Sequence, residues 1–473
     1  MSQSLKELLR RNNFSYCITN SILICLRRSK VPPNFYTFHG ARIRGFCDVL
    51  SSKSDERNSM QVPKVKKPRK KPPSAQERHL EKFYSHLRDC NEGLDIKSIP
   101  NRYISSAVSS AEGLYVVGLK TADIIANELM ESNVNTPIIE VNPGVGIVTE
   151  ALLRKGAREV HTFQSSLWEG QKFQGVEDKD ARKVVFYKND FFSIWKRLLL
   201  DYFDDDSQKA LLNIVKPKPW SAEPPAKIFA AMPNKSFINH MIASIVFQKG
   251  FFQIGRLEFY LAIRPHDYLS VTADGTANYL VYRAVSVLFQ IMFERKILCR
   301  LPAKDFIPWI KPFSARMKQY LPKLSAADAD CIYLVKIIPR KDVHDLVEGE
   351  DGLKTLWHFV RQCFTSRSNR VIPTLEKWIP GCGPRLIFNN MTIYTQFGEL
   401  SPQQVLKLFQ DFTKWPEYPH CSFLDSLEAY LLKSYMEKNP DGISEADFES
   451  ADGSLEEDHD YEPDTESRRS KRA

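Results

Sequence analysis

The segment between residues 137 and 149 constrains the fold more than any other part of the chain. An apolar run at 137–141 contains Glu140 and is followed by a Gly-x-Gly turn, Gly144 and Gly146, which opens a helical pattern. Glycines adopt turn angles that a side chain forbids and let a ligand approach the backbone, and the free amides of the next helix attract polar groups. The segment predicts a nucleotide or S-adenosylmethionine loop. An ordinary strand-to-helix turn is the alternative.

Strand and helix patterns alternate along the middle of the chain. We expect strands at 137–141, 159–163, 183–187, 226–231, 258–264 and 332–338, and helices at 121–130 and 149–155. This alternation predicts an α/β fold with a doubly wound, mostly parallel sheet. Helical patterns at 352–364, 402–413 and 423–436 predict a small C-terminal α-helical domain. The proline-rich segment 216–225 is expected to project from the surface.

Two basic segments precede this region. Residues 1–46 contain eight Lys or Arg residues and one acid, mixed with Ser, Leu and Ile, which is typical of a mitochondrial presequence. Residues 47–76 are rich in Ser, Pro and Lys and predict an extended linker. Its cations predict a nucleic-acid-binding arm, with nuclear localisation as the alternative; they include Lys66, Lys67, Arg69 and Lys70.

Charge divides the chain into a basic body and an acidic end. The net charge is +9; twelve acidic and four basic residues from Asp441 onward contribute −8, which leaves +17 for residues 1–440. A basic body attracts nucleic acid, although solubility alone also explains it. Residues 439–473 are predicted to be an acidic, disordered tail.

Cysteine and histidine usage excludes several classes of site. Nine scattered cysteines form no Cys-x-x-Cys pair and the ten histidines show no ligand spacing, so we expect a reducing compartment and no metal. No apolar run approaches the ~20 residues of a membrane span, and no membrane association is expected.

At the glycine loop the chain resembles the small-subunit rRNA adenine N6,N6-dimethyltransferase family. Glu140, Pro143, Gly144, Gly146 and Thr149 match its first motif. The resemblance implies a Rossmann-like S-adenosylmethionine-dependent methyltransferase fold over residues 77–344, with the helical domain at 345–438. It implies S-adenosylmethionine as the cofactor, with candidate contacts at Ile104, Glu140, Gly144, Gly146, Gln164 and Asp190.

Two departures from the family pattern affect the chemistry. Gln164 stands where the family keeps an acid that accepts hydrogen bonds from the cofactor ribose, so cofactor affinity should fall. The segment Ala231-Met232-Pro233-Asn234 stands where the family has Asn-Leu-Pro-Tyr, whose Asn holds the target amine and whose Tyr stacks on a flipped adenine. Ala231 offers no acceptor, although with a shifted alignment Asn234 could still be one. The resemblance therefore predicts weak or absent methyl transfer.

A closer resemblance is to the mitochondrial transcription factor branch of that family. Segments 214–220, 255–258 and 337–340 carry it. This branch implies a mitochondrial matrix or nucleoid protein that assists the mitochondrial RNA polymerase and holds melted promoter DNA. Cations interleaved with aromatics are candidates to bind it; they include Arg316, Lys318 and Arg367. The alternatives are an active dimethyltransferase of small-subunit rRNA and an RNA-binding assembly factor without catalysis.

Overall fold

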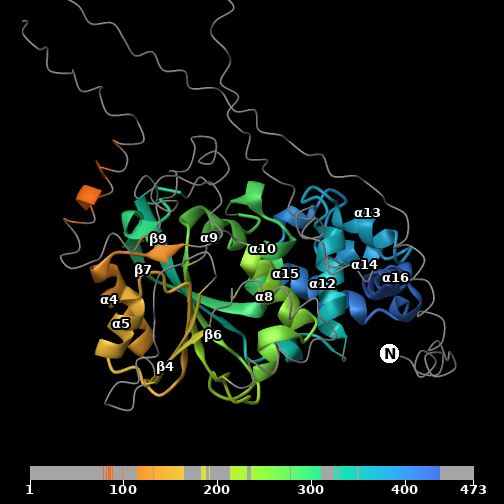
Figure 1. The fold of residues 1–473 in the computed structure, drawn as a ribbon. Coiled ribbons are helices and arrows are strands. Elements are labelled where there is room, and N and C mark those ends of the chain that lie inside the picture. Colours follow the sequence, from red (N-terminus) through yellow and green to blue (C-terminus); the bar gives the residue numbers. More distant parts are fainter. Residues whose placement is uncertain are drawn as a thin grey trace, which may run out of the picture. The chain divides into compact units, whose positions relative to one another are not determined.

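A seven-stranded sheet lies at the centre of the computed structural model, in the order β4-β3-β2-β5-β6-β9-β7 (Figure 1). The strands are β2 Ile138–Val141, β3 Glu159–Phe163, β4 Lys183–Tyr187, β5 Lys227–Ala231, β6 Glu258–Ile263, β7 Phe293–Pro302 and β9 Cys331–Pro339. The first five are parallel, whereas β9 runs antiparallel to both β6 and β7. A separate pair joins β1 Tyr115–Val116 to β8 Phe306–Ile307. The predicted mostly parallel sheet is confirmed.

The structure describes residues 114–131, 133–164, 183–187, 191, 214–231, 236–276, 278–309, 324, 325, 328, 330–348 and 351–436, with single positions between 78 and 99. All of them belong to one unit that extends from Lys71. The predicted presequence 1–46, linker 47–76 and tail 439–473 lie outside the described residues. The domain boundary at 345 stays a prediction; it falls inside the 3₁₀ helix Val343–Leu346, which follows β9.

Helices cover both faces of the sheet, as a doubly wound fold requires. The helices are α4 Leu119–Glu131, α5 Ile147–Arg154, α8 Ser236–Val246, α9 Pro265–Val271, α10 Ala284–Met292, α12 Gly352–Cys363, α13 Val371–Glu376, α14 Gly383–Phe388, α15 Pro402–Thr413 and α16 Ser422–Met436. Short 3₁₀ helices occupy Gly250–Ile254, Tyr279–Val281, Ala303–Asp305, Val343–Leu346, Phe397–Glu399 and Tyr418–His420.

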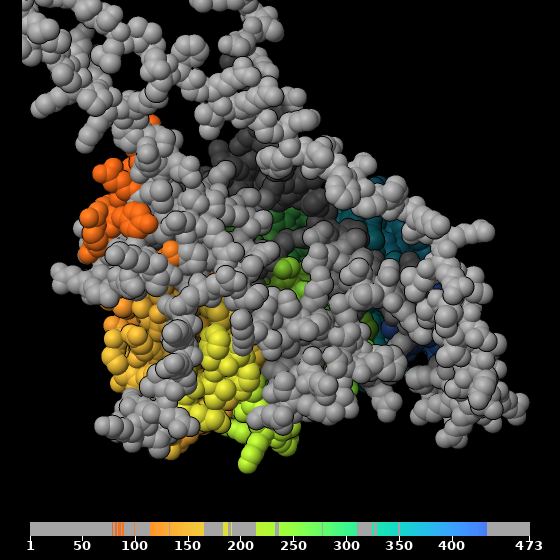
Figure 2. All heavy atoms as spheres, in the orientation of Figure 1, coloured from red at the N-terminus to blue at the C-terminus, as the bar shows by residue number. Residues whose placement is uncertain are grey.

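Alternation along the strands gives each face its own core. Ile138, Phe229 and Ala231 point into a cluster with the buried residues of α4 and α5. Ile139 and Ala230, their neighbours in sequence, point into a second cluster on the opposite face. The central strands β2 and β5 are buried on both faces, which explains their nearly continuous apolar sequences. Figure 2 shows that the outer surfaces of α4 and α5, in orange and gold, are exposed.

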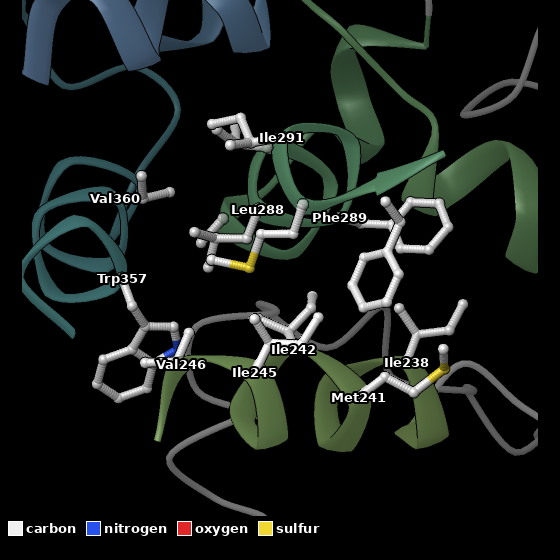
Figure 3. Close-up of a cluster of buried hydrophobic side chains, with 14 of the residues drawn as sticks. Ile238, Met241, Ile242, Ile245, Val246, Leu288, Phe289, Ile291, Trp357 and Val360 are labelled. Carbon is white, nitrogen blue, oxygen red and sulfur yellow. The ribbon is translucent and has the colours of Figure 1, made fainter. Parts of the chain in front are cut away.

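The second core continues without interruption into the C-terminal helices. Ile242 and Ile245 of α8 face Leu288 of α10, and Trp357 and Val360 of α12 lie beside them (Figure 3). The helices after residue 351 therefore share one apolar core with the sheet. The start of α15 is fixed by a reciprocal capping box. The Ser401 hydroxyl accepts from the Gln404 amide, the Gln404 side-chain oxygen accepts from the Ser401 amide, and Pro402 follows the cap.

One sequence prediction needs correction, and one strand was missed. The segment 216–225 does not project as a whole, because the Trp220 indole donates to the Arg340 carbonyl at 3.1 Å and packs edge-on to His344. The ten-residue strand β7 was not predicted. Its residues are mostly half-buried or exposed, so its sequence lacks the apolar alternation that marks the other strands.

Candidate cofactor and base site

The two loops singled out by the sequence lie next to each other in the sheet. Strand β2 pairs with β3 on one side and with β5 on the other, so the strand order reverses between β2 and β5. Val141, which ends β2, is the register partner of Ala230. Parallel α/β sheets bind ligands at the carboxyl ends of the strands where the order reverses. The glycine loop and the end of β5 therefore meet at the expected ligand-binding edge.

The backbone of the loop requires its glycines. Gly144 and Gly146 have φ angles of 57° and 83°, and Gly146 is the N-cap of α5. A Cβ added to Gly144 would lie 3.0 Å from the Tyr115 ring, which packs over the loop from β1. Gly144 is thus fixed both by its left-handed conformation and by the contact with Tyr115.

Glu140 braces the loop from within. Its side chain is buried, with 1% exposed, and accepts a hydrogen bond of 2.5 Å from the Thr149 hydroxyl on α5. Burial raises the pKa of Glu140 to about 7, and the Thr149 hydrogen bond opposes this rise. Because the Glu140 carboxyl group is hydrogen-bonded to the helix that follows the loop, it stabilises the loop in this structure.

Gln164 closes the loop from the other side. Its Oε1 accepts a hydrogen bond of 3.1 Å from the Gly144 amide, and the residue follows directly after β3. Its Nε2 and the Oδ1 of Asn142 are buried, and neither atom has a hydrogen-bond partner in the described part of the chain. One buried donor and one buried acceptor next to a glycine loop are suited to a polar ligand.

These residues fit S-adenosylmethionine, with one change from the family pattern. A ribose hydroxyl can both donate and accept, so it can satisfy Asn142 Oδ1 and Gln164 Nε2. The bound cofactor would supply a methyl group on a sulfonium. Gln164, however, offers a neutral donor where the family has an acceptor carboxylate, because its oxygen already binds Gly144.

The last described residue of β5, Ala231, offers no side-chain acceptor. Ala231 is buried in the apolar cluster that also holds Tyr260 and Ala262, and Ala262 is its register partner on β6. A methyl group there cannot receive the hydrogen bond of a target amine. Five other candidate positions lie outside the described residues: Ile104, Asp190, Met232, Pro233 and Asn234.

Among the nucleic-acid candidates, the structure describes Arg367 only. Its guanidinium lies 5.2 Å above the Tyr279 ring and donates to the Leu280 carbonyl at 3.1 Å. The others, Lys66, Lys67, Arg69, Lys70, Arg316 and Lys318, lie outside the described range.

Sequence reasoning missed a second cation beside Arg367. Arg370 lies 5.3 Å from the centre of the exposed Tyr394 ring. Gln396 joins the two pairs, because it accepts from the Tyr279 hydroxyl at 3.0 Å and forms a backbone bridge with Arg370. In sequence Arg370 already lay in the stretch 361–378, which interleaves cations with aromatics, but its aromatic partner is 24 residues away.

Among the described residues no group of His, Cys, Asp or Glu could hold a metal ion. Within the same portion of the chain, no helix is long and apolar enough to cross a membrane. Five of the cysteines are described, and all five are free: Cys299, Cys331, Cys363, Cys382 and Cys421.

Comparison with known proteins places the chain in a family. The mitochondrial dimethyladenosine transferase 2 of Drosophila melanogaster is 36% identical over 335 residues, which cover 63% of this chain and 74% of that protein. The chain belongs to the mitochondrial dimethyladenosine transferase 2 family. The human member is 24% identical over 63% of this chain and 75% of its own length. The rat member is 27% identical over 50% of this chain, which spans 61% of that protein.

Other comparisons are less specific. No family model matches the chain. A solved dimethyladenosine transferase from Plasmodium falciparum is similar with a TM-score of 0.38 and 13% identity, over 62% of this chain and 96% of that one. The resemblance predicted from the glycine loop is confirmed by the family relatives, and the sheet order and helix placement agree with a methyltransferase fold.

The burial of Glu140 predicts a pH-dependent stability. Its folded pKa of about 7 exceeds the ordinary value of 4.5, so the stabilising protonated form is complete below about pH 4.5 and is lost as pH rises through 7. Glu140→Gln cannot ionise and can still accept from Thr149. The variant should gain stability relative to the wild type from pH 5 to pH 8, by on the order of 3 kcal/mol.

Urea unfolding at the two pH values measures this difference. Glu150→Gln, which changes an exposed acid on the first turn of α5, serves as the control and should show no such gain. If the free energies of unfolding of the wild type and Glu140→Gln differ by the same amount at both pH values, the raised pKa of Glu140 is contradicted.

Proposed function

We propose that this protein is a mitochondrial transcription initiation factor that uses a methyltransferase fold to hold melted promoter DNA beside the mitochondrial RNA polymerase. The observation that carries the proposal is Ala231, which puts a methyl group in an apolar cluster where a dimethyltransferase needs an amine acceptor. The relatives are named as mitochondrial dimethyladenosine transferases, which supports a mitochondrial location and descent from a methyltransferase. Without that acceptor the shape remains and the base-holding chemistry is lost.

The cation and aromatic groups around Gln396 support a role in binding unpaired DNA. Arg367 and Arg370 provide positive charge for phosphates, while Tyr394 presents an exposed ring on which a base can stack. Neither arginine forms an ion pair with a carboxylate among the described residues. Their charge is therefore available to a polyanion, in keeping with the basic body of the chain.

Replacing both arginines tests this role. The double variant Arg367→Ala, Arg370→Ala should bind a fluorescent single-stranded promoter oligonucleotide more weakly than the wild type. The slope of log K against log [salt] should become shallower by about 1.4, since two phosphate contacts are lost. Run-off RNA made with the purified polymerase should fall in parallel.

Arg385→Ala is the matched control. Arg385 also lies over an aromatic ring, that of Trp415, but its guanidinium is engaged by both oxygens of Glu417 at 2.6 and 2.7 Å. The control should bind DNA like the wild type. Promoter-specific RNA of undiminished yield without the protein would reject the proposed function.

The second candidate is an active rRNA adenine dimethyltransferase. The glycine loop and the unpaired polar atoms of Asn142 and Gln164 favour it, since they fit the cofactor. Transfer of labelled methyl groups to a small-subunit rRNA hairpin distinguishes the two functions. We expect no turnover; clear transfer that Gly144→Ala abolishes would reverse the ranking.

We further propose that the cofactor binds weakly because of Gln164. In Gln164→Glu one carboxylate oxygen can keep the Gly144 amide while the other accepts a ribose hydroxyl with charge-assisted strength. Calorimetry with S-adenosylmethionine should show affinity about tenfold higher in this variant. Gln253→Glu adds the same charge at an exposed position and should change nothing. Equal affinity in Gln164→Glu and the wild type would contradict this role.

A further inference from the structure

Helix α14 and the turns that follow it present large apolar side chains to solvent (Figure 1). We define the apolar patch as Ile387, Phe388, Ile393 and Tyr394, whose side chains are 54%, 89%, 52% and 65% exposed. Single exposed apolar residues are common on protein surfaces, but four of them within one short segment mark an interaction surface.

Two consecutive turns hold the apolar patch outward. The Met391 amide donates to the Leu386 carbonyl at 3.1 Å, and the Thr392 amide donates to the Thr395 hydroxyl at 2.9 Å. Leu386 and Phe397 are fully buried in the core that the sheet shares with the C-terminal helices. The segment therefore has its own anchors in the core, and the four exposed side chains are additional to them.

Three exposed cations border the apolar patch: Arg370, Lys377 and Lys414. Arg370 lies 5.3 Å from the centre of the Tyr394 ring. Lys377 follows the last residue of α13, which packs against α14, and Lys414 follows the last residue of α15. None of the three forms an ion pair with a carboxylate among the described residues.

Two acids of the same region are engaged by other groups. Glu417 accepts from both terminal nitrogens of Arg385, which lies one turn before Phe388 and over the Trp415 ring. Glu376 accepts from two glycine amides at the start of α14, at 2.7 and 2.6 Å. The three cations of the border are thus left to an anionic partner.

This arrangement matches an anionic lipid surface. Aliphatic and phenyl side chains at the tip suit the acyl chains, a tyrosine at the edge suits the headgroup level, and surrounding cations suit anionic headgroups. The 89% exposure of Phe388 shows that its side chain projects beyond its neighbours. A bilayer surrounds a projecting side chain without a matching pocket, and the net charge of +17 on residues 1–440 attracts the chain to it.

We propose that the apolar patch docks this protein on an anionic lipid bilayer, with Phe388 and Ile393 inserted among the acyl chains. The sequence predicted no membrane association because it has no apolar run that spans a bilayer. The apolar patch needs no such run, since two turns bring its residues together. This docking goes beyond the proposed function and does not rest on it. The variants below leave Arg370 and Tyr394 unchanged, because the proposed function uses both for DNA.

Site-specific photo-cross-linking in the full chain tests the contact. Benzoylphenylalanine in place of Phe388, irradiated with vesicles of phosphatidylcholine and phosphatidylglycerol in equal parts, should form adducts with the lipid acyl chains. The same group in place of Ile124, an exposed apolar position on α4, should form none. Absence of lipid adducts from position 388, or cross-links from it to a second copy of the chain instead, would overturn the docking.

Flotation with the same vesicles measures what the apolar patch contributes. Ile387→Ser with Phe388→Ser should lower the partition coefficient at least ~10-fold, whereas Ile124→Ser with Val134→Ser, at two other exposed apolar positions, should leave it unchanged. The predicted presequence 1–46 is present in every variant and so does not produce the difference. Equal partitioning of the patch variant and the wild type would contradict the proposal.

Charge reversal tests the cationic border. Lys377→Glu with Lys414→Glu should lower the partition coefficient on the anionic vesicles about tenfold or more. Lys120→Glu with Lys155→Glu, at exposed positions on α4 and directly after α5, gives the same net charge and should have a clearly smaller effect. Losses of equal size in the two variants would show attraction by net charge alone and would overturn docking at this patch.

Discussion

Two side-chain hydrogen bonds hold the glycine loop, and the arrangement of the site depends on them. Thr149 donates to Glu140 across the loop, and the Gly144 amide donates to Gln164 from the neighbouring strand. Together they tie β2, β3 and α5 to one another at the edge where the sheet order reverses. A loop closed by the protein's own groups is a folding element as well as a ligand site. Its presence therefore does not by itself indicate catalysis.

The proposed loss of base-holding chemistry at the same edge would leave the shape of the site unchanged. The end of β5 needs only a small apolar side chain to pack between β6 and the α4–α5 layer, and Ala231 provides it. Polar groups remain on the cofactor side, at Asn142 and Gln164. We propose that the fold retains a place for S-adenosylmethionine but has lost the amine acceptor of the base side. In the same proposal Arg367 and Arg370, which form no ion pair among the described residues, bind nucleic acid instead.

Much of the fold could be predicted because it rests on local patterns. The mostly buried strand β3 and the half-buried edge strand β4 were predicted at 159–163 and 183–187, and the structure gives the same bounds. Strand β7 and the packing of Trp220 could not be predicted, because both depend on partners distant in sequence. The site residues stay a prediction, and the hydrogen bonds among the described ones could not be predicted. The sequence named Gln164, yet only the structure shows that its oxygen accepts from the Gly144 amide and that its buried Nε2 has no partner among the described residues.

The proposed function requires that the protein open promoter DNA without methyl transfer. Fluorescence of 2-aminopurine placed in the melted region of a promoter, with polymerase and this protein present, measures opening directly. The account predicts equal opening without cofactor, with S-adenosylmethionine and with S-adenosylhomocysteine, and no opening when the protein is omitted. Opening that requires S-adenosylmethionine and is blocked by S-adenosylhomocysteine would contradict it.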